Sequence, residues 1–446
     1  MRFIPSYILI LFITITIDYI AAIKIEKSES KKRKKFILLL GIINTCLVLF
    51  IFKYFDFFID NINFFYGLLN LPKIRHWGII LPIGLSFHTF QSLSYVIEVY
   101  RGNLKAEKNL LTYSLFVTMF PQLVAGPIER ARNILPQLKK CDHIIKYSDF
   151  SIGLTRFFWG LLKKVVIADT AAIFVNSVYN NFEFHNGSTL LVATFLFGIQ
   201  IYCDFSGYSD MAIGIAQMLG FRFKENFTIP YFSKNVTEFW RRWHISLSGW
   251  FRDYLFWPLS YRISGKLKKE RYLCIKTEYI IFICATLITF LLCGLWHGAS
   301  WNFVFWGGLN GLILSIEILF KKKKQRTFYF IGKLLRTSYV FIAISFTWVF
   351  FRAATFSQSV TILKKIFFQF SLSSFQFLNT NIFATIIFSI LILICTEYFF
   401  LRKSSFAVLF SKKNGDIQTT SVTIIMIFFI ILFGNSDGSQ FIYFQF

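Results

Sequence analysis

The sequence has few of the residues that shape soluble, loop-rich proteins. It contains only 8 prolines, 7 cysteines and 23 acidic residues among 446. The cysteines are scattered and form no CxxC pair, which argues against a disulfide framework or a zinc site. No HExxH sequence is present, so the signature of zinc hydrolases is missing. We therefore expect neither a metal nor a bound cofactor.

Long apolar runs, by contrast, recur through the whole chain. The sequence is 55% hydrophobic, with 59 phenylalanines, and its apolar runs have about the 17–25 residues that span a ~30 Å bilayer core. This pattern predicts an all-α, polytopic integral membrane protein that forms a single domain over residues 1–446. The first run, Phe3 to Ile23, is too long for a signal peptide and lacks a small-residue cleavage site, so we interpret it as a retained membrane helix.

The positive charge of the chain is explained by the distribution of lysine and arginine in a membrane protein. The formal net charge is +25, but the cations gather in short runs between apolar blocks, such as KKRKK at 31–35 and KKKKQR at 321–326. This is the positive-inside pattern, and anionic lipid headgroups can bind such clusters. No nucleic-acid-binding motif accompanies them. We expect the lipid bilayer, and no nucleic acid, as the partner of these charges.

Placing the basic runs in the cytoplasm predicts about ten (9–12) transmembrane helices, with both termini outside. The stretch 204–276 mixes polar and apolar residues. We expect it to form re-entrant or surface helices around a cavity, because polar groups at membrane depth need water or protein partners. The predicted crossings are 3–23, 36–52, 77–100, 151–180, 189–203, 279–297, 301–320, 334–351, 381–401 and 418–434.

Among only six histidines, His244 stands out by its neighbours. It lies in EFWRRWHISLSGWFRDYLFWPL, residues 238–259, which holds four tryptophans and three arginines. One interpretation is an interfacial helix with tryptophans at the headgroup level. The other is a cluster that binds an anionic, phosphate-bearing substrate at the cytoplasmic mouth of a cavity. The candidate residues for lining a substrate site or tunnel in this stretch are Trp240, Arg241, Arg242, Trp243, Ser248, Arg252 and Asp253.

His297 is the second unusual histidine, in the apolar stretch GLWHGASWN. A histidine at membrane depth is costly unless it faces a polar cavity, so it is a functional-site candidate, together with its neighbours Trp296 and Asn302. The alternative is a buried histidine bonded to a carbonyl group. Two histidines suit proton abstraction near neutral pH, because imidazole titrates there.

Two further polar segments interrupt the apolar pattern. YCDFSGYSDMAIGIAQMLG, residues 202–220, contains Asp204 and Asp210, which could form an acid/base pair or have a structural or cavity-lining role. FPQLVAGPIERARNILPQL, residues 120–138, contains three prolines and predicts a broken, re-entrant segment.

These segments, together with LPIGLSFHTFQSLSYVIEVYRG (81–102) and the final FIYFQF (441–446), occur in the same order in the membrane-bound O-acyltransferase (MBOAT) family, which the sequence resembles. The similarity is greatest to the bacterial branch that acetylates alginate and peptidoglycan. It runs from about residue 70 to the C-terminus, with a motif core at about 70–311 followed by C-terminal helices and a tail at 312–446. The resemblance implies a ring-like helical bundle in which a cytoplasmic tunnel meets an external funnel.

The resemblance also implies a function, that of an O-acyltransferase in the bacterial inner membrane. The donor would be a cytoplasmic thioester, most simply acetyl-CoA. The acceptor would be a hydroxyl of an extracytoplasmic polysaccharide, as in alginate or peptidoglycan O-acetylation, or of a periplasmic or extracellular partner acetyltransferase. D-alanyl transfer to teichoic-type polymers, a transporter and a non-catalytic scaffold are the alternatives.

The same resemblance assigns roles to individual residues. His297 is expected to be the catalytic base, and His244 to act in catalysis or to shape the tunnel and position the donor. His244, Asn302 or backbone N–H groups would stabilise the oxyanion. Tyr443, in the apolar tail, is either a membrane anchor or an acyl relay, since it resembles a C-terminal tyrosine motif of teichoic-acid D-alanylation machinery.

Overall fold

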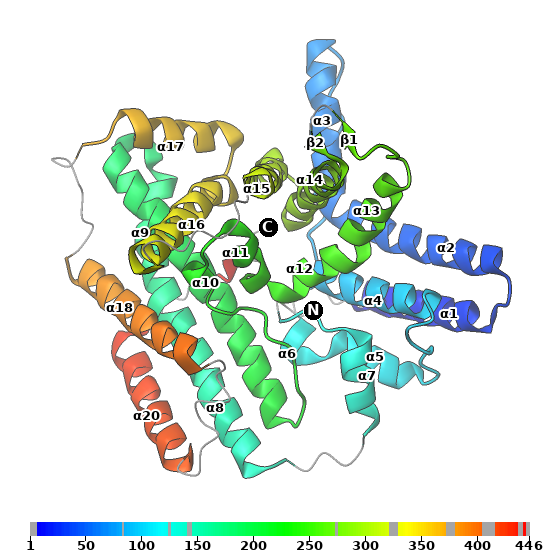
Figure 1. Ribbon diagram of the computed structural model, residues 1–446, viewed down its shortest axis with the longest axis horizontal. Helices are drawn as coiled ribbons and strands as arrows, with labels where there is room; N and C mark the ends of the chain where they lie inside the picture. The colour runs from blue at the N-terminus through cyan, green and yellow to red at the C-terminus, as the bar shows by residue number, and fades with distance from the viewer. Residues whose placement is uncertain are drawn as a thin grey trace. The chain divides into compact units, whose positions relative to one another are not determined.

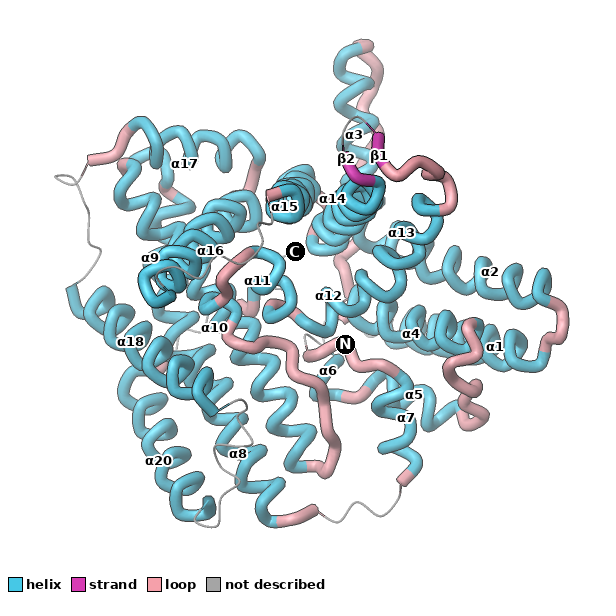
Figure 2. The backbone as a smooth tube through the Cα atoms, viewed as in Figure 1, coloured by secondary structure: helices cyan, strands magenta, loops and turns pink. Residues whose placement is uncertain are grey.

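The computed structural model describes residues 7–82, 84–123, 126–140, 145–272, 275–320, 329–371, 380–403, 415–435 and 440–442. Their regular structure is almost all helical (Figures 1 and 2). The exception in this part of the chain is one antiparallel pair of short strands, β1 (Arg271–Tyr272) and β2 (Ile275–Lys276). The all-α prediction is therefore confirmed. The chain forms two compact units, residues 1–144 with 298–300, and residues 145–297 with 301–446.

The first unit is built around three packed helices, with α1 against both α2 and α4. Its interior holds a small polar cluster in which the Ser92 hydroxyl donates to the Asp18 carboxylate and lies 2.9 Å from the Tyr113 hydroxyl. The helices of this unit are α1 (Tyr7–Lys27), α2 (Lys31–Leu49), the π-helical η1 (Phe50–Tyr54), α3 (Phe55–Leu68), α4 (Leu85–Tyr100), α5 (Leu110–Thr118), α6 (Phe120–Leu123) and α7 (Ala131–Lys139).

The second unit contains the long central helix α10 and a group of shorter helices that follow it (Figure 1). Helix α10 packs against α8, α9 and α16. The helices of this unit are α8 (Tyr147–Leu162), η2 (Lys163–Ala168), α9 (Asp169–Asn180), η3 (Phe182–Phe184), α10 (Gly187–Met218), η4 (Pro230–Phe232), α11 (Val236–Arg242), α12 (Ile245–Phe251), η5 (Arg252–Phe256), α13 (Trp257–Ser264), α14 (Thr277–His297), α15 (Trp301–Leu319), α16 (Tyr329–Arg352), α17 (Phe356–Phe368), α18 (Thr380–Lys403) and α20 (Gly415–Phe433).

Helices α14 and α15 pack backbone to backbone, and this contact places the end of α14. A Cβ atom added at Gly294 would lie 2.1 Å from the carbonyl oxygen of Phe303, and one added at Gly307 would lie 2.1 Å from that of Phe290. Only glycine permits this approach, which is the usual function of small residues between membrane helices. The two glycines therefore determine where His297, the last residue of α14, is placed.

Several predicted membrane crossings coincide with helices in the structure. Six helical stretches in the described part of the chain are long and apolar enough to span a membrane, namely Tyr7–Lys27, Lys31–Leu68, Gly187–Met218, Thr277–His297, Trp301–Leu319 and Gly332–Arg352. Two shorter apolar helices, Phe383–Phe399 and Thr419–Phe433, match the last two predicted crossings. The total of about ten crossings stays a prediction.

Several predicted crossings differ in their bounds from the helices of the structure. The crossing predicted at 36–52 lies in a helical stretch that runs from Lys31 to Leu68. The crossing predicted at 189–203 is part of a helix that continues to Met218, because the polar residues of its second half find buried partners. In the crossing predicted at 77–100, the helix begins only at Leu85. Before it stands Gly84 with a φ of 81°, a left-handed conformation that cannot continue into a regular helix.

Candidate functional site

A cavity of about 790 Å³ in the second unit brings together residues from α11, α12, η5, α13 and α14. Both singled-out histidines line it, although 53 positions separate them in the sequence (297 minus 244). The predicted site residues in its wall are His244, His297, Trp240, Trp243, Arg241, Ser248, Arg252 and Asp253. The stretch 204–276 was predicted to surround a cavity, and its short helices α11 to α13 contribute to the wall of this one.

His244 lies between two short helices, in an unusual backbone conformation. Its φ and ψ are 43° and 55°, the left-handed region that side-chain-bearing residues rarely adopt. The turn is held by two backbone hydrogen bonds to a neighbouring segment, from Ile245 N–H to the Asn226 carbonyl (2.8 Å) and from Thr228 N–H to the Arg242 carbonyl (3.0 Å). Strained backbone of this kind is concentrated at functional sites, where the surrounding structure maintains it.

The His244 ring is enclosed and electrically neutral. It is 1% exposed, its Nδ1 atom lies 3.1 Å from Oδ1 of Asn226, and the Phe205 ring packs perpendicular to it at 4.6 Å between centroids. Burial lowers the pKa of His244 from its ordinary 6.5 to about 3, because the surroundings solvate the imidazolium form poorly. The ring therefore carries no charge near neutral pH.

His297 lies in an aromatic box at the end of α14. Its ring packs nearly perpendicular to Trp306 and at a steep angle to Phe351, with centroid distances of 5.1 and 5.4 Å. The ring of Trp296 lies 5.0 Å from His297 and 6.5 Å from His244, so it contacts both histidines. His297 is 7% exposed. Apolar walls of this kind exclude water from a reacting group and strengthen the electrostatic interactions around it.

Cationic side chains give the cavity its electrostatic character. Arg241 and Arg252 both line it, and Arg252 Nε donates to Asp253 at 3.0 Å while its side chain stays 61% exposed. Arg242, in contrast, pairs with Glu238 at 2.6 Å and is not among the described residues of the wall. Two guanidinium groups at a cavity that also holds histidines suit a phosphate-bearing ligand.

The structure places the two predicted carboxylates of α10 in ion pairs outside this cavity wall. Asp210 accepts from Arg156 (2.7 Å) and Lys163 (2.5 Å). Asp204 pairs with Lys164 (2.7 Å) and accepts the backbone N–H of Ile442 (2.8 Å), so that it holds the C-terminal segment. The cations of α8 and η2 neutralise charges that would otherwise be costly to bury. This geometry fits the structural role, one of the two that the sequence left open.

The remaining predicted residues lie around the cavity or outside the described residues. Trp296 touches both histidines, but neither it nor Asn302 is among the described residues that line the wall. The Asn302 amide donates to the Ala353 carbonyl at 2.8 Å. Tyr443 lies outside the described residues. Among the residues that the structure describes, no group of three or more histidine, cysteine or acidic side chains could hold a metal ion.

Sequence reasoning missed Asn226, which contacts His244, and Cys293, which lines the cavity one turn before His297. A single buried asparagine in a loop has no periodicity, spacing or neighbouring motif that would signal a role. Cys293 had the right spacing, since residues four apart share a helix face. Its presence among apolar residues, however, indicated only a small hydrophobic group.

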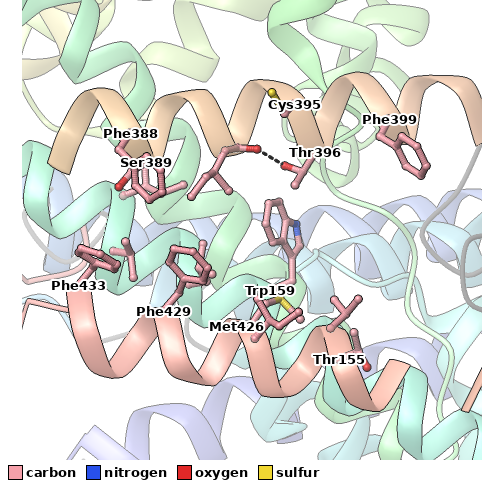
Figure 3. Close-up of a pocket in the computed structure, with 16 residues that line it drawn as sticks. Thr155, Trp159, Phe388, Ser389, Cys395, Thr396, Phe399, Met426, Phe429 and Phe433 are labelled. Carbon is pink, nitrogen blue, oxygen red and sulfur yellow. Dashed lines mark hydrogen bonds between the residues drawn. The ribbon is translucent and has the colours of Figure 1, made fainter. Parts of the chain in front are cut away.

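A second cavity, of about 510 Å³, lies among α8, α18 and α20 and has a different lining (Figure 3). Aromatic and aliphatic side chains such as Trp159, Met426 and Phe429 form most of its wall, and the described residues that line it include no histidine and no charged group. The hydroxyl of Thr396 donates to the Ile392 carbonyl of its own helix (2.8 Å), which satisfies it locally. The described residues of its wall therefore supply no histidine or carboxylate that could act as the general base of acyl transfer.

The described residues include six helical stretches long and apolar enough to span a membrane, and a cavity lined by two buried histidines. These features are those of a multi-pass membrane protein with a polar site. The sequence model of the membrane-bound O-acyltransferase family matches residues 27–356, which is most of the chain and extends over both units. The chain belongs to this family. The resemblance found in the sequence motifs is thereby confirmed, including its bacterial O-acetyltransferase branch.

Three relatives show the range of chemistry named for similar proteins. The protein named probable alginate O-acetylase AlgI of Pseudomonas syringae is 40% identical over 77% of this chain and 63% of its own length. The peptidoglycan O-acetyltransferase of Helicobacter pylori is 32% identical over 99% of this chain and 88% of its own. The teichoic acid D-alanyltransferase of Bacillus subtilis is 28% identical over 74% and 80%. The chain thus spans less than two thirds of the length of the alginate O-acetylase.

Proposed function

We propose that the protein is an O-acyltransferase of the bacterial cell membrane that moves an acyl group, most simply acetyl, from a thioester donor to a hydroxyl acceptor. The observation that carries the proposal is the convergence of two buried histidines on one cavity, in a chain of this family. The donor is acetyl-CoA or another cytoplasmic acyl thioester, and it enters from the side of the basic loops.

The chemistry uses His297 as a general base. His297 takes the proton of the acceptor hydroxyl, the hydroxyl oxygen forms a C–O bond with the thioester carbonyl, and the C–S bond breaks. The proton then passes to the departing thiolate, so no net proton is consumed. General base catalysis contributes about 10²–10⁴-fold. Arg241 and Arg252 bind the phosphate groups of the donor, because charge-assisted hydrogen bonds from guanidinium groups suit phosphate.

The acceptor is an extracytoplasmic polysaccharide, peptidoglycan, or a partner acetyltransferase that passes the acetyl group on. Relatives named alginate O-acetylase and peptidoglycan O-acetyltransferase support acetyl as the acyl group. The relative named teichoic acid D-alanyltransferase favours a second candidate, D-alanyl transfer from a thioester carrier. Ester-linked acetate and ester-linked D-alanine are both released by mild alkali, and they are distinguished because only D-alanine carries an amine.

We further propose that Tyr443 carries or relays the acyl group. Two contacts support this: Ile442, the preceding residue, is held by Asp204, and the Phe441 ring packs against Phe205 at 6.1 Å. Phe205 in turn contacts His244, so the segment before Tyr443 is anchored beside the histidine site. An acyl adduct on Tyr443 in intact-mass analysis supports the relay. A fully active Tyr443→Phe variant without an adduct makes the tail an anchor only.

The decisive test compares cell-envelope polysaccharides from a deletion strain complemented with wild type, His297→Ala or His244→Ala. Ester-linked acetate and D-alanine are measured after mild alkali, and membrane levels of each variant are checked by immunoblot. Loss of one ester in the deletion strain and in the His297→Ala strain supports the proposal, and the fraction that loses it identifies the acceptor. Unchanged ester levels in every fraction contradict the proposal. The protein would then be a transporter or a non-catalytic scaffold.

A further inference from the structure

Asn226 is a fully buried asparagine whose side-chain orientation can be assigned without ambiguity. One end of its amide faces both the backbone N–H (3.2 Å) and the hydroxyl (2.8 Å) of Ser246, and the other end lies 3.1 Å from the Ser209 hydroxyl. A backbone N–H can only donate. The amide atom that faces Ser246 must therefore be the oxygen, Oδ1, and the NH₂ group faces Ser209.

This orientation determines which nitrogen of His244 carries hydrogen. The Nδ1 atom of His244 lies 3.1 Å from the same Oδ1 atom, which offers only lone pairs. The hydrogen bond therefore requires a proton on Nδ1. A neutral imidazole has one N–H and one acceptor nitrogen. The lowered pKa of His244 keeps the ring neutral near pH 7, so Nε2 is the acceptor.

We propose that Asn226 is a positioning residue that holds His244, a residue of the cavity wall, in the Nδ1–H tautomer, so that Nε2 is the hydrogen-bond acceptor of the ring. In its bearing on catalysis the inference rests on the proposed function. It makes His244 the partner of a substrate hydroxyl or thiol, and it removes His244 from the possible oxyanion donors, since a neutral ring in this tautomer has no N–H left to donate. The oxyanion then depends on backbone N–H groups.

Aromatic rings pack around His244 beside Asn226. The ring neighbours of His244 are Phe205, Phe227 and Trp296, and Asn226 is also in contact with the backbone N–H of Ser246. The titratable and charged groups that share the cavity wall with His244 are Arg241, Arg252, Asp253, Cys293 and His297.

The tautomer can be measured directly, without any assay of transfer. The full-length protein is labelled with ¹⁵N-histidine, reconstituted in lipid nanodiscs, and its ring nitrogens are recorded between pH 5 and 8. The resonances missing from a His244→Asn variant are those of His244. The expected result is a protonated Nδ1 and an unprotonated Nε2 throughout this range. A protonated Nε2 in the wild-type protein overturns the proposal, whether or not acyl transfer is detected.

Variants of Asn226 test the link to catalysis. Asn226→Leu removes the acceptor and should lower kcat on the order of 10²-fold, with donor KM changed less than about threefold, because a wrong tautomer disables the histidine and not donor binding. Asn226→Asp keeps an acceptor oxygen and should restore most of kcat and the Nδ1–H tautomer. Asn310→Leu is the matched control, since Asn310 is equally buried but bonds the Trp306 carbonyl.

The outcomes separate this inference from the proposed function. An Asn226→Leu protein with wild-type kcat and an unchanged tautomer overturns the positioning role. If Asn226→Leu does not accumulate in membranes, the wild-type tautomer and the rescue by Asn226→Asp decide the question. A wild-type protein with the Nδ1–H tautomer but no acyl transfer contradicts the proposed function and leaves the tautomer assignment standing.

Discussion

The two cavities of the second unit are of similar size, about 790 and 510 Å³, but their walls have opposite chemistry. The larger one combines His244, His297 and two arginines with tryptophans. The smaller one is lined by side chains such as Phe388 and Phe429 with a few hydroxyl groups (Figure 3). Volume and enclosure therefore do not distinguish a reaction site here. What does is the presence of ionisable groups that the fold keeps at a cavity despite the cost of burial.

The two cavity walls are stabilised by different interactions. Ionisable groups in an apolar protein persist where other groups hold them, as Asn226 and the backbone turn hold His244. Apolar side chains in a wall need no hydrogen-bonding partners, because contact with lipid hydrocarbon is as favourable for them as contact with protein. The comparison predicts that substitutions at the first cavity act on chemistry, and that substitutions at the second act on stability.

Removal of the proposed base should have the largest effect. His297→Ala is expected to lower acyl transfer by about 10²–10⁴-fold, because the acceptor hydroxyl loses its general base. The measurement is ester formation per mole of purified protein. His185→Ala is the matched control, since His185 lies in the loop before α10 and does not line the cavity among the described residues. Equal losses in both variants would mean that neither reports on the cavity.

A charge placed in the apolar cavity should act on stability. Met426→Asp, in the wall of the smaller cavity, should cost about 2.5–3.5 kcal/mol, the cost of an acidic side chain at the centre of a membrane helix. Thermal unfolding in detergent measures this loss, and Met426→Leu, which conserves volume, is the control. Transfer per folded molecule should be unchanged. Loss of transfer in a fully folded Met426→Asp protein would show that the apolar cavity takes part in the reaction.

The pH dependence of stability should report the buried neutral His244. Below its ordinary pKa of 6.5 the unfolded chain binds a proton on this residue, whereas the folded protein does so only near 3. Stability is therefore lost as pH falls from 6.5 towards 3, at about 1.4 kcal/mol per unit from this group.

The measurement is unfolding of wild type and of His244→Asn in detergent across pH 4 to 7. The variant cannot titrate at this position, so its stability should fall less steeply with decreasing pH. Parallel curves for the two proteins would mean that His244 is protonated in the folded state.

The smallest effect is expected from the Arg252–Asp253 ion pair in the cavity wall. Asp253→Asn frees the guanidinium of Arg252, which now pairs at 3.0 Å with a side chain that is 29% exposed. Exposed pairs are worth about 0.2–1 kcal/mol, so the donor KM should decrease by less than about fivefold. Glu238→Gln is the control, because it breaks the pair of Arg242, which is not among the described residues of the wall. An increase in KM in Asp253→Asn would show that the carboxylate itself binds the donor.

Much of the fold could be predicted from composition and motif order. The apolar runs indicated helices at 279–297 and 301–320, and the structure has helices with nearly these bounds. The length of α10 could not be predicted in the same way. The apolar run ends at Asp204 in the sequence. The helix continues because Asp204 and Asp210 form ion pairs with Lys164 and Lys163, from a distant segment.

The candidate site was predictable in its residue types but not in its geometry. His244 and His297 stood out because histidine is rare and costly in apolar surroundings. That both line one cavity depends on the packing of α14 against α15 and on the turn between α11 and α12. Nothing in the sequence separated Arg241, which lines the cavity, from Arg242, which pairs with Glu238.

The sequence by itself determined that this protein is helical, lies in a membrane and carries two histidines in apolar surroundings. These properties follow from the local order of residues, because apolar length and charge clusters act through solvation at each segment. Only the tertiary structure decided which arginines face the cavity, that Asp204 holds the C-terminal segment, and that Asn226 contacts His244. Such contacts join residues far apart in the chain, and their geometry is set by how whole helices pack.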